Sequence, residues 1–429
     1  MHETYIPDWV KGNGKIDEVL FAQEFLANHR LQFTEGSFFT QEGRIDDPGI
    51  LKKEIYEEIS LYITCGAARR VDAILATIAL EARKENLTLP ETVIHVANGT
   101  YHLIDGFSPE KEICRHRLPV HFDDRWPEPQ LWLSFLRELL EPEDIDTLQE
   151  YMGYCLTPQT NAQKMLLIVG SGGEGKSRIG VVMKALLGDN MVNGSIAKLE
   201  LSPFARADLE HRLLMVDDDL RMEALPQTNH IKTIISADCP LDLERKGVQS
   251  YQGRIYARLM AFGNETLQSL YDHSHGFYRR QLILMAKPRD PSRPDDPYLG
   301  NKLTEERDAI FHWALQGLFR LMGNDFRFTI SQRSRELMQR NVEKGNNVLS
   351  FLQSEGYFRF DSAGSASSRA LYSRYREWCE DNALNPLSSR SFSQTLEMHP
   401  GLGLRYTTHV PIGNGKMARG YRGIRLCPL

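Results

Sequence analysis

The sequence predicts an α/β protein with a mostly parallel sheet in its central region, a mainly helical region before it and a smaller mixed region after it. Between residues 160 and 290, four short apolar runs alternate with segments of helical pattern, which is typical of strands buried between helices. These runs are 165–169, 213–216, 258–262 and 281–285. The first 150 residues, by contrast, are mostly of helical pattern. We therefore expect three domains, at residues 1–155, 156–335 and 336–429.

The composition is typical of an ordinary globular protein. The chain has 429 residues, of which 41% are apolar and 25% charged, and this length allows about two or three domains. Its apolar runs are only a few residues long, whereas a membrane span requires roughly 20, and no secretory signal is visible. The six cysteines show no metal-ligand spacing, which favours a reducing compartment. We expect a cytoplasmic protein with no membrane partner.

Charge is unevenly distributed along the chain. The net charge is −6, but residues 1–150 hold 15 Lys and Arg against 28 Asp and Glu, whereas residues 365–429 hold 9 against 4. An acidic front and a basic tail indicate that any contact with a polyanion lies toward the C-terminal end. The alternative is that each domain simply has its own isoelectric point.

The N-terminal region is predicted to contain helices and one small β element. Its first 20 residues are polar and contain glycine, which indicates a loose leader. Residues 17–84 and 131–154 show helical periodicity. Between them, two β-like runs flank Asn98–Gly99, a dipeptide that strongly favours a hairpin turn.

A phosphate-binding loop is predicted directly after the first apolar run. Residues 170–177, Gly-Ser-Gly-Gly-Glu-Gly-Lys-Ser, match G-x-x-x-x-G-K-[ST] between a predicted strand and helix, so a chance glycine-rich turn is the weaker alternative. Glycines let the backbone N–H groups point at phosphate, and the helix N-terminus adds positive charge. Lys176 would hold the β- and γ-phosphates of ATP, and Ser177 would ligate Mg²⁺. The expected nucleotide-binding residues are Gly170, Ser171, Gly172, Gly173, Glu174, Gly175, Lys176, Ser177 and Arg178.

Two carboxylates are expected to complete the metal site. Residues 213–216 predict a strand, and Asp217, Asp218 and Asp219 follow it. One carboxylate would join Ser177 around Mg²⁺, and its neighbour would activate water. We assign these roles to Asp217 and Asp218 because they come directly after the strand, and which acid is the base stays open. The alternative is an acidic cap on a following helix.

Further polar residues lie near the ends of the last two runs. Asn264 follows the third run and would contact the γ-phosphate and position water, although Asn is also a common turn residue there. Arg279 and Arg280 precede the last run and are suited to stabilising phosphate charge, within one subunit or across to a neighbour. The alternative for the arginines is a surface pair. His273 and His275 nearby are expected to be solvated rather than metal-binding.

These motifs occur in an order that resembles the superfamily 3 helicases, a branch of the AAA+ ATPases. The order is strand and phosphate loop, strand and acidic pair, strand and Asn, then Gly-Phe-Tyr-Arg-Arg at 276–280. The resemblance is greatest to the helicase half of the phage, plasmid and poxvirus-type primase-helicases, and it extends over roughly residues 90–429. Other segments that resemble this family are Asn98–Gly99, Leu118–Val120, Trp132, Phe135, Leu148–Tyr154, Gln163–Lys164, Lys232–Asp238, Leu241–Lys246, Leu371–Cys379 and Arg390–Phe392.

The resemblance implies a fold and a nucleotide site. The fold would be an AAA+ P-loop ATPase core with a mainly helical N-terminal domain and a C-terminal winged-helix domain. Lys176 and Ser177 would bind nucleotide and Mg²⁺. Asp217 and Asp218 would be the acidic pair, and Asn264 would be the γ-phosphate sensor.

The resemblance also implies an assembly and a DNA contact. Family members are typically hexameric rings, so Arg279 would reach the nucleotide of a neighbouring subunit, with Arg280 as the fallback. Lys246, beside Arg245, would reach into the central channel and track single-stranded DNA. The partners would therefore be further copies of the chain and single-stranded or forked DNA.

The sequence departs from the family in three respects. Glu174 stands where the family usually carries Asn, which adds a negative charge near phosphate. Val248 stands where a second basic residue often follows the hairpin lysine. Only about 90 residues precede the matching region, too few for the primase domain of many relatives. A primase, if needed, is expected to be a separate polypeptide, and a separate primase or polymerase is an expected partner.

The basic tail predicts a second DNA contact. Residues 411–425 form a glycine-rich pattern with spaced cations. We expect Lys416, Arg419 and Arg422 to lie along a phosphate backbone, where each neutralised phosphate adds salt-dependent affinity. The alternative is an exposed hairpin whose charges serve solubility.

Three functions are compatible with these observations. The first is an ATP-driven DNA helicase of phage, plasmid or mobile-element replication, with ATP and Mg²⁺ as cofactors. The alternative is an origin-binding initiator or loader that uses ATP only to assemble on duplex DNA. A small-molecule P-loop kinase fits less well, because such chains usually lack a long basic tail.

Overall fold

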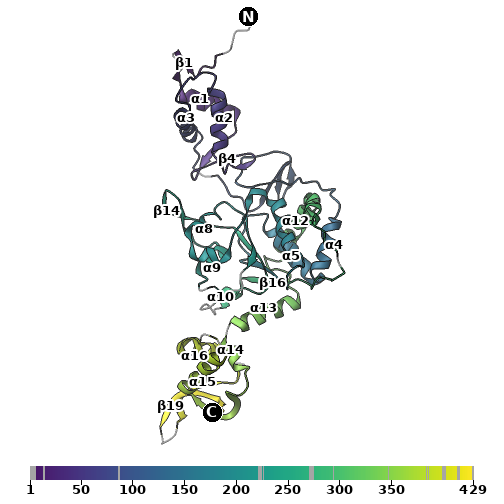
Figure 1. Cartoon of the computed structure of the whole chain (residues 1–429), viewed down its shortest axis with the longest axis vertical. Coiled ribbons are helices and arrows are strands. Elements are labelled where there is room, and N and C mark those ends of the chain that lie inside the picture. Colours follow the sequence, from purple (N-terminus) through teal and green to yellow (C-terminus); the bar gives the residue numbers. More distant parts are fainter. Residues whose placement is uncertain are drawn as a thin grey trace. The chain divides into compact units, whose positions relative to one another are not determined.

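The computed structural model describes most of the chain, which divides into two compact units (Figure 1). The described residues are 6–12, 15–85, 87–220, 225, 227–269, 275–292, 294–345, 347–382, 384, 386–398, 402–412 and 416–427. The first unit comprises Met1–Arg221, His230–Glu265 and Leu284–Ser331, and the second comprises Met222–Asn229, Thr266–Ile283 and Gln332–Leu429. No helix in the described ranges is long and apolar enough to cross a lipid bilayer.

A five-stranded sheet contains the four apolar runs. Its strands, in spatial order, are β11 (Met191–Asn193), β12 (Leu214–Leu220), β15 (Arg258–Gly263), β10 (Met165–Val169) and β16 (Gln281–Met285). The first four pair in parallel, and β10 and β15 are buried along their whole length, as in a sheet covered on both faces. The four predicted strands are therefore confirmed. The sequence does not predict β11, because three residues are too few to show periodicity.

Helices pack against this sheet and against one another. They are α4 (Gln130–Leu139), α5 (Pro142–Tyr154), α6 (Ser177–Leu187), α11 (Leu299–Glu305) and α12 (Arg307–Gly323). α5 and α12 lie side by side (Figure 1) and approach closely at two glycines. A Cβ on Gly153 would stand 2.3 Å from the carbonyl oxygen of Ala314, and one on Gly317 would stand 2.4 Å from that of Gln149. The two helices are therefore too close for a larger residue at either position.

Besides β12, three short helices and a hairpin lie between β11 and β15 in the described sequence. The helices are α7 (Ile196–Leu201), α8 (Pro203–Ala207) and α9 (Asn229–Ser236), and a 3₁₀ turn at Gly188–Asn190 precedes β11. The hairpin pairs β13 (Leu241–Arg245) with β14 (Val248–Gly253) across the turn Lys246–Gly247. The family resemblance implies a hairpin in this segment, and the structure contains one.

The described residues before position 86 form three helices and two small sheets. They are α1 (Glu18–Asn28), α2 (Gly49–Ile59), α3 (Ala67–Glu81), the sheet of β1 (Val10–Lys11) and β2 (Lys15–Ile16), and the sheet of β3 (Gln32–Thr34), β4 (Ser37–Thr40) and β5 (Gly43–Arg44). The predicted loose leader is wrong for its described residues, because Trp9 is 3% exposed and its ring packs edge-on against Phe21, with centroids 4.9 Å apart. The predicted helical span is also interrupted, by β3–β5.

A four-stranded sheet follows α3. Its spatial order is β8 (Gly106–Ser108), β7 (Gly99–His102), β6 (Val93–Val96) and β9 (Arg117–Leu118). The predicted hairpin is confirmed, but its turn is Ala97–Asn98, one residue earlier than expected. Asn98 Nδ2 donates to the carbonyl oxygen of Phe122, and Asn98 Oδ1 accepts from the backbone N–H of Phe122, both at 2.9 Å. Asn98 therefore holds the segment after β9 as well as forming the turn.

The second unit has a core of its own beside a three-stranded antiparallel sheet. Its helices are α10 (His275–Tyr278), α13 (Gln332–Gly345), α14 (Asn347–Leu352), α15 (Ser368–Asp381) and α16 (Ser389–Met398), and its sheet has the order β17 (Phe358–Ser367), β19 (Met417–Leu426) and β18 (Arg405–Pro411). Phe351, Tyr375 and Tyr421 are among its largest buried side chains. The mixture of helices and strands predicted for the tail is confirmed.

Candidate functional site

Residues 170–177, which we call the glycine-rich loop, connect β10 to α6. Gly172, Gly173 and Gly175 have φ values of +106°, +82° and +104°, in a region that residues with a Cβ rarely adopt. The backbone can therefore curl between the strand and the helix. The N-terminus of α6 adds partial positive charge at the same place, because its first N–H groups have no partner within the helix. The combination suits an anion such as phosphate.

The ends of three parallel strands bring the predicted polar residues together. β10, β15 and β12 run in parallel, and the acidic run Asp217–Asp219 forms the second half of β12. The backbone N–H of Gly170 donates to the carbonyl oxygen of Gly263 at 3.1 Å, which joins the loop to the end of β15. Asn264 follows Gly263 in the chain and lies beside the loop. A Cβ added to Gly172 would stand 3.9 Å from Asn264 Oδ1. The loop, the acidic run and Asn264 thus share the carboxyl end of the sheet, where α/β proteins of this kind bind ligands.

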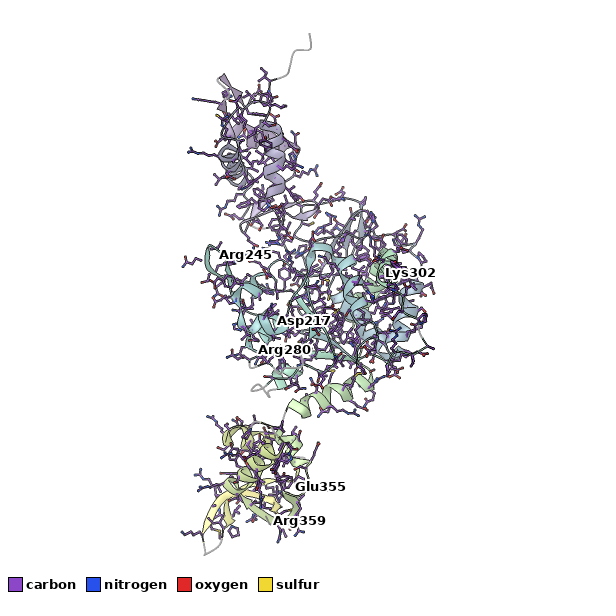
Figure 2. The ribbon with its side chains drawn as sticks, viewed as in Figure 1. Asp217, Arg245, Arg280, Lys302, Glu355 and Arg359 are labelled. Atoms are coloured by element: carbon purple, nitrogen blue, oxygen red, sulfur yellow. The ribbon has the colours of Figure 1, made fainter. Side chains whose placement is uncertain are left out.

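The acidic run begins inside the sheet. The sequence predicts that Asp217 and Asp218 follow the strand, but this is wrong, because β12 continues to Leu220 with a register shift after Asp217. Asp217 is 5% exposed, and its Oδ2 accepts a hydrogen bond from the backbone N–H of Ile196 at 2.8 Å. Burial raises the pKa of Asp217, and the negative charges of Asp219 and Asp218 add to the increase. Asp217, labelled in Figure 2, therefore holds the start of α7.

Asp218 lies in a different environment from Asp217. It is exposed and lines a cavity of about 270 Å³ together with Ser177, Val181 and Asn193. The structure therefore brings Ser177 and Asp218 to one cavity, while Asp217 faces α7. Within the described part of the chain, no three His, Cys, Asp or Glu side chains cluster as metal ligands do. One hydroxyl and one carboxylate instead match the donors of Mg²⁺, which usually keeps substrate phosphates and water among its ligands.

Glu174 binds two donors of its own loop. Its Oε1 accepts from the N–H of Gly172 at 2.8 Å, and its Oε2 accepts from Lys176 Nζ at 2.7 Å. Glu174 is 3% exposed and Lys176 is 8% exposed, so the ion pair is buried. Burial by itself raises the pKa of Glu174, but the hydrogen bonds from Lys176 and the backbone outweigh it and leave the pKa below its usual range.

Ser171 and Arg178 complete the predicted nucleotide-binding set. Ser171 is exposed in the loop. Arg178 lies in the first turn of α6, and its Nη1 is 3.4 Å from where a Cβ on Gly300 would stand. The structure therefore places the Arg178 guanidinium beside α11.

The predicted hairpin cations lie at and beside the hairpin turn. Lys246 is exposed within the turn, and Val248 is 54% exposed just after it. Arg245 donates to Tyr251 Oη at 3.1 Å and to Glu210 Oε2 at 2.8 Å, and Tyr251 Oη donates to the same carboxylate oxygen at 2.6 Å. Arg245 (Figure 2) is thus held by its neighbours, whereas Lys246 is presented to solvent.

Two buried charged residues that the sequence did not single out connect α7 and α8 to their surroundings. Glu200 is 5% exposed, and its Oε1 accepts from the backbone N–H of Ile231 in α9 at 2.8 Å. Arg206, also 5% exposed, donates to the carbonyl oxygens of Leu199 and of Asp242 in β13, at 2.9 and 3.3 Å. A charged residue in a segment of helical pattern carries no sequence signal of burial, so sequence reasoning had no means of finding them.

Arg279 and Arg280 belong to the second unit. They lie between α10 and β16, where Arg279 is exposed and Arg280 Nη1 donates to the carbonyl oxygen of Gly276 at 2.6 Å. Figure 2 labels Arg280. His273 and the side chain of His275 lie outside the described residues, so the expectation for these histidines stays a prediction.

The predicted tail cations lie on or beside β19. Arg419 and Arg422 are exposed on this strand, and Lys416 is exposed immediately before it. Arg422 is the direct partner of Arg405 on β18, and like charges at opposed positions of a sheet repel each other. Residues 413–415, which the sequence includes in this hairpin, lie outside the described residues.

Comparisons with known proteins match two segments of the chain to families and most of the chain to solved structures. Residues 168–280 match a family of unknown function (DUF5906), and residues 343–407 match a family described as poxvirus D5 protein-like. An A-form apo structure of the NrS-1 C-terminal region is 13% identical, with 90% of this chain and 87% of that chain covered and a TM-score of 0.52. Another apo structure of that region is 12% identical, with 95% and 99% covered and a TM-score of 0.53. At these identities the likeness establishes the fold, which is a mixed α/β fold with a parallel sheet.

Proposed function

We propose that the chain is an ATP-dependent DNA helicase of the poxvirus D5-like kind, acting in the replication of a phage, plasmid or other mobile element. The observation that carries the proposal is the convergence of the glycine-rich loop, Asp218 and Asn264 at one end of the parallel sheet. The D5-like match and the fold shared with the NrS-1 region support it. The order of the sequence motifs, which resembles that of superfamily 3, adds further support.

In this proposal the central region is an AAA+ P-loop core that binds ATP and Mg²⁺, with domain boundaries after residues 155 and 335. The loop would hold the phosphates, with Lys176 neutralising part of their charge, and Ser177 and Asp218 would hold Mg²⁺. Mg²⁺ would neutralise part of the negative charge of the phosphates. Asn264, whose Oδ1 lies beside Gly172 of the loop, would orient a water at the γ-phosphate. Asp217 would keep the start of α7 in place.

The same proposal assigns the DNA contacts and the assembly. Lys246, at an exposed hairpin turn, would contact single-stranded DNA within a ring of identical subunits, expected to be a hexamer. Arg279 would reach the nucleotide of a neighbouring subunit, with Arg280 as the fallback. The tail would be a winged-helix domain in which Arg419 and Arg422 follow a DNA backbone. A primase or polymerase would be a separate partner.

The test compares the wild-type chain with a Lys176→Ala variant. We expect wild type to hydrolyse ATP, to be stimulated by single-stranded DNA and to unwind a forked duplex. Removing a donor that stabilises transferring phosphate should reduce hydrolysis at least about 100-fold. Phosphate release and strand displacement measure the two activities, and Lys53→Ala, at a side chain 76% exposed on α2, is the control. A Lys176→Ala protein that hydrolyses ATP and unwinds DNA at the wild-type rate would contradict the proposal.

A second candidate function is an origin-binding initiator or loader that uses ATP only to assemble on duplex DNA. Arg405 and Arg422 favour it, because two arginines at directly opposed positions of a sheet put two positive charges where a phosphate backbone could bind. Strand displacement on a fork that lacks any origin sequence would count against this candidate. ATP hydrolysis without unwinding would favour it over the helicase.

A further inference from the structure

Glu174 places a negative charge in the site that the glycine-rich loop offers to an anion. Its carboxylate binds Lys176 Nζ at 2.7 Å and the N–H of Gly172 at 2.8 Å. A lysine ammonium and loop N–H groups are the donors that such loops present to phosphate. The partial positive charge at the start of α6 favours the same carboxylate. The loop therefore holds an anion of its own.

The packing around Glu174 keeps its carboxylate within the loop. Glu174 Oε1 is 2.7 Å from where a Cβ on Gly170 would stand, so the side chain folds back against the first residue of the loop. Because Glu174 and Lys176 are both buried, salt screens their attraction much less than that of a surface pair. Removing one partner from a buried ion pair is costly, since the other charge is left unpaired. An incoming anion must therefore replace Glu174 as the partner of Lys176.

We infer that Glu174 sets the nucleotide affinity of the loop by competing with the phosphates of ATP for Lys176. The inference rests on the proposed function, because it assumes that the loop binds a nucleoside triphosphate. In the structure, Glu174 is a positioning residue that holds the Lys176 ammonium in place. When a triphosphate enters, Lys176 must leave Glu174, and the two anions repel each other. A neutral residue of the same size at position 174 should therefore bind ATP more tightly.

The experiment measures binding of mant-ATP with Mg²⁺ by fluorescence to the full chain and its variants. We expect Glu174→Gln, which keeps the size and removes the charge, to lower Kd about tenfold, the equivalent of one charge-assisted hydrogen bond. The control is Glu128→Gln, at an exposed position outside the loop, and its Kd should equal that of wild type. Glu174→Asn is the second variant, measured in case the first fails to fold. A second readout is the rise in Tm on adding ATP, which should be larger for the Glu174 variants.

The outcomes separate this inference from the function on which it rests. One outcome is that wild type binds mant-ATP, Lys176→Ala does not, and both Glu174 variants bind no more tightly than wild type. The proposed competition between Glu174 and ATP is then wrong, although the nucleotide site is supported. If neither wild type nor any Glu174 variant binds, the nucleotide site itself is wrong and the inference fails with it. Tighter binding by the Glu174 variants, with Glu128→Gln unchanged, supports the competition.

Discussion

At the scale of single residues, the adjacent carboxylates of Asp217 and Asp218 differ in burial, and this difference suits them to different roles. Asp217 is buried and bound to the N–H of Ile196, whereas Asp218 is exposed in the cavity with Ser177. A buried carboxylate that accepts a backbone hydrogen bond is suited to holding that backbone, and an exposed one is suited to binding a cation. The two residues should therefore respond differently to substitution.

Alanine substitutions test this division. Asp217→Ala should reduce the free energy of unfolding by about 1–3 kcal/mol, because the buried N–H of Ile196 loses its acceptor. Asp217→Asn keeps an oxygen acceptor for this N–H, so its free energy of unfolding should fall less than that of Asp217→Ala. Asp218→Ala should stay within about 0.5 kcal/mol of wild type and lose Mg²⁺-dependent hydrolysis. Urea unfolding and phosphate release measure the two effects, and the assignment fails if Asp218→Ala is the less stable of the two alanine variants.

The sequence locates the residues of the site but not their partners. The loop is recognisable because phosphate binding requires glycines, a lysine and a hydroxyl at fixed spacing in a continuous segment. The pairing of Glu174 with Lys176 cannot be predicted in this way, because residues two apart in a loop have no fixed relative geometry. The different surroundings of Asp217 and Asp218 depend on Ile196, which lies about 20 residues earlier in the chain. Such distant contacts leave no local pattern.

At the scale of secondary-structure elements, the contact between α5 and α12 depends on glycine. Gly317→Ala would push a methyl group toward the carbonyl oxygen of Gln149, 2.4 Å from the ideal Cβ position. We expect a loss of about 1–3 kcal/mol in the free energy of unfolding, as for other overpacked contacts. Gly323→Ala is the matched control on the same helix, because nothing lies within 4 Å of its Cβ position. It should be neutral or stabilising by up to about 1 kcal/mol.

Urea unfolding midpoints of the two alanine variants decide this prediction. Equal midpoints for Gly317→Ala and Gly323→Ala would show that α5 and α12 can move apart without cost. A lower midpoint for Gly317→Ala alone would confirm the close approach of the two helices.

The strands of the central sheet could be predicted because each forms a continuous apolar run, as burial on both faces requires. The short strands β3, β4, β5 and β11 could not, because two to four residues show no periodicity. The hairpin near residue 98 was found from its Asn-Gly dipeptide, yet its turn lies one residue earlier. Asn98 binds Phe122, and Gly99 lies so close to β8 that a Cβ would stand 2.2 Å from the carbonyl oxygen of Ser108. Tertiary contacts thus set the register of this turn.

At the scale of the whole molecule, we expect three buried histidines to make stability depend on pH. Burial lowers the pKa of His95 to about 4, of His116 to about 3 and of His211 to about 4, and nearby positive charges add to the effect for each of them. In the unfolded chain their pKa values are about 6.5. Between these values the unfolded state binds protons that the folded state does not, so stability falls as pH falls.

As the pH falls below 6, the neutral state of each of these histidines should lower the free energy of unfolding by up to about 1.4 kcal/mol per pH unit. Urea unfolding at pH 7 and pH 5 measures the loss. His116→Gln removes one of the three titrations and should show a smaller loss between the two pH values. His409→Gln, at an exposed histidine on β18, should behave as wild type. Equal stability of the wild-type chain at both pH values would contradict the neutral state of the buried histidines.

The anchoring of α7 has a consequence for how far a local change can spread. Its first residue is hydrogen-bonded to Asp217, Glu200 near its end is bound to α9, and Leu199 is joined through Arg206 to β13. Hydrogen bonds thus connect Asp217 in β12, through the six-residue helix α7 and Arg206, to the hairpin that carries Lys246. We therefore expect a substitution at Asp217 to be felt beyond α7, as a changed environment of the hairpin that carries Lys246.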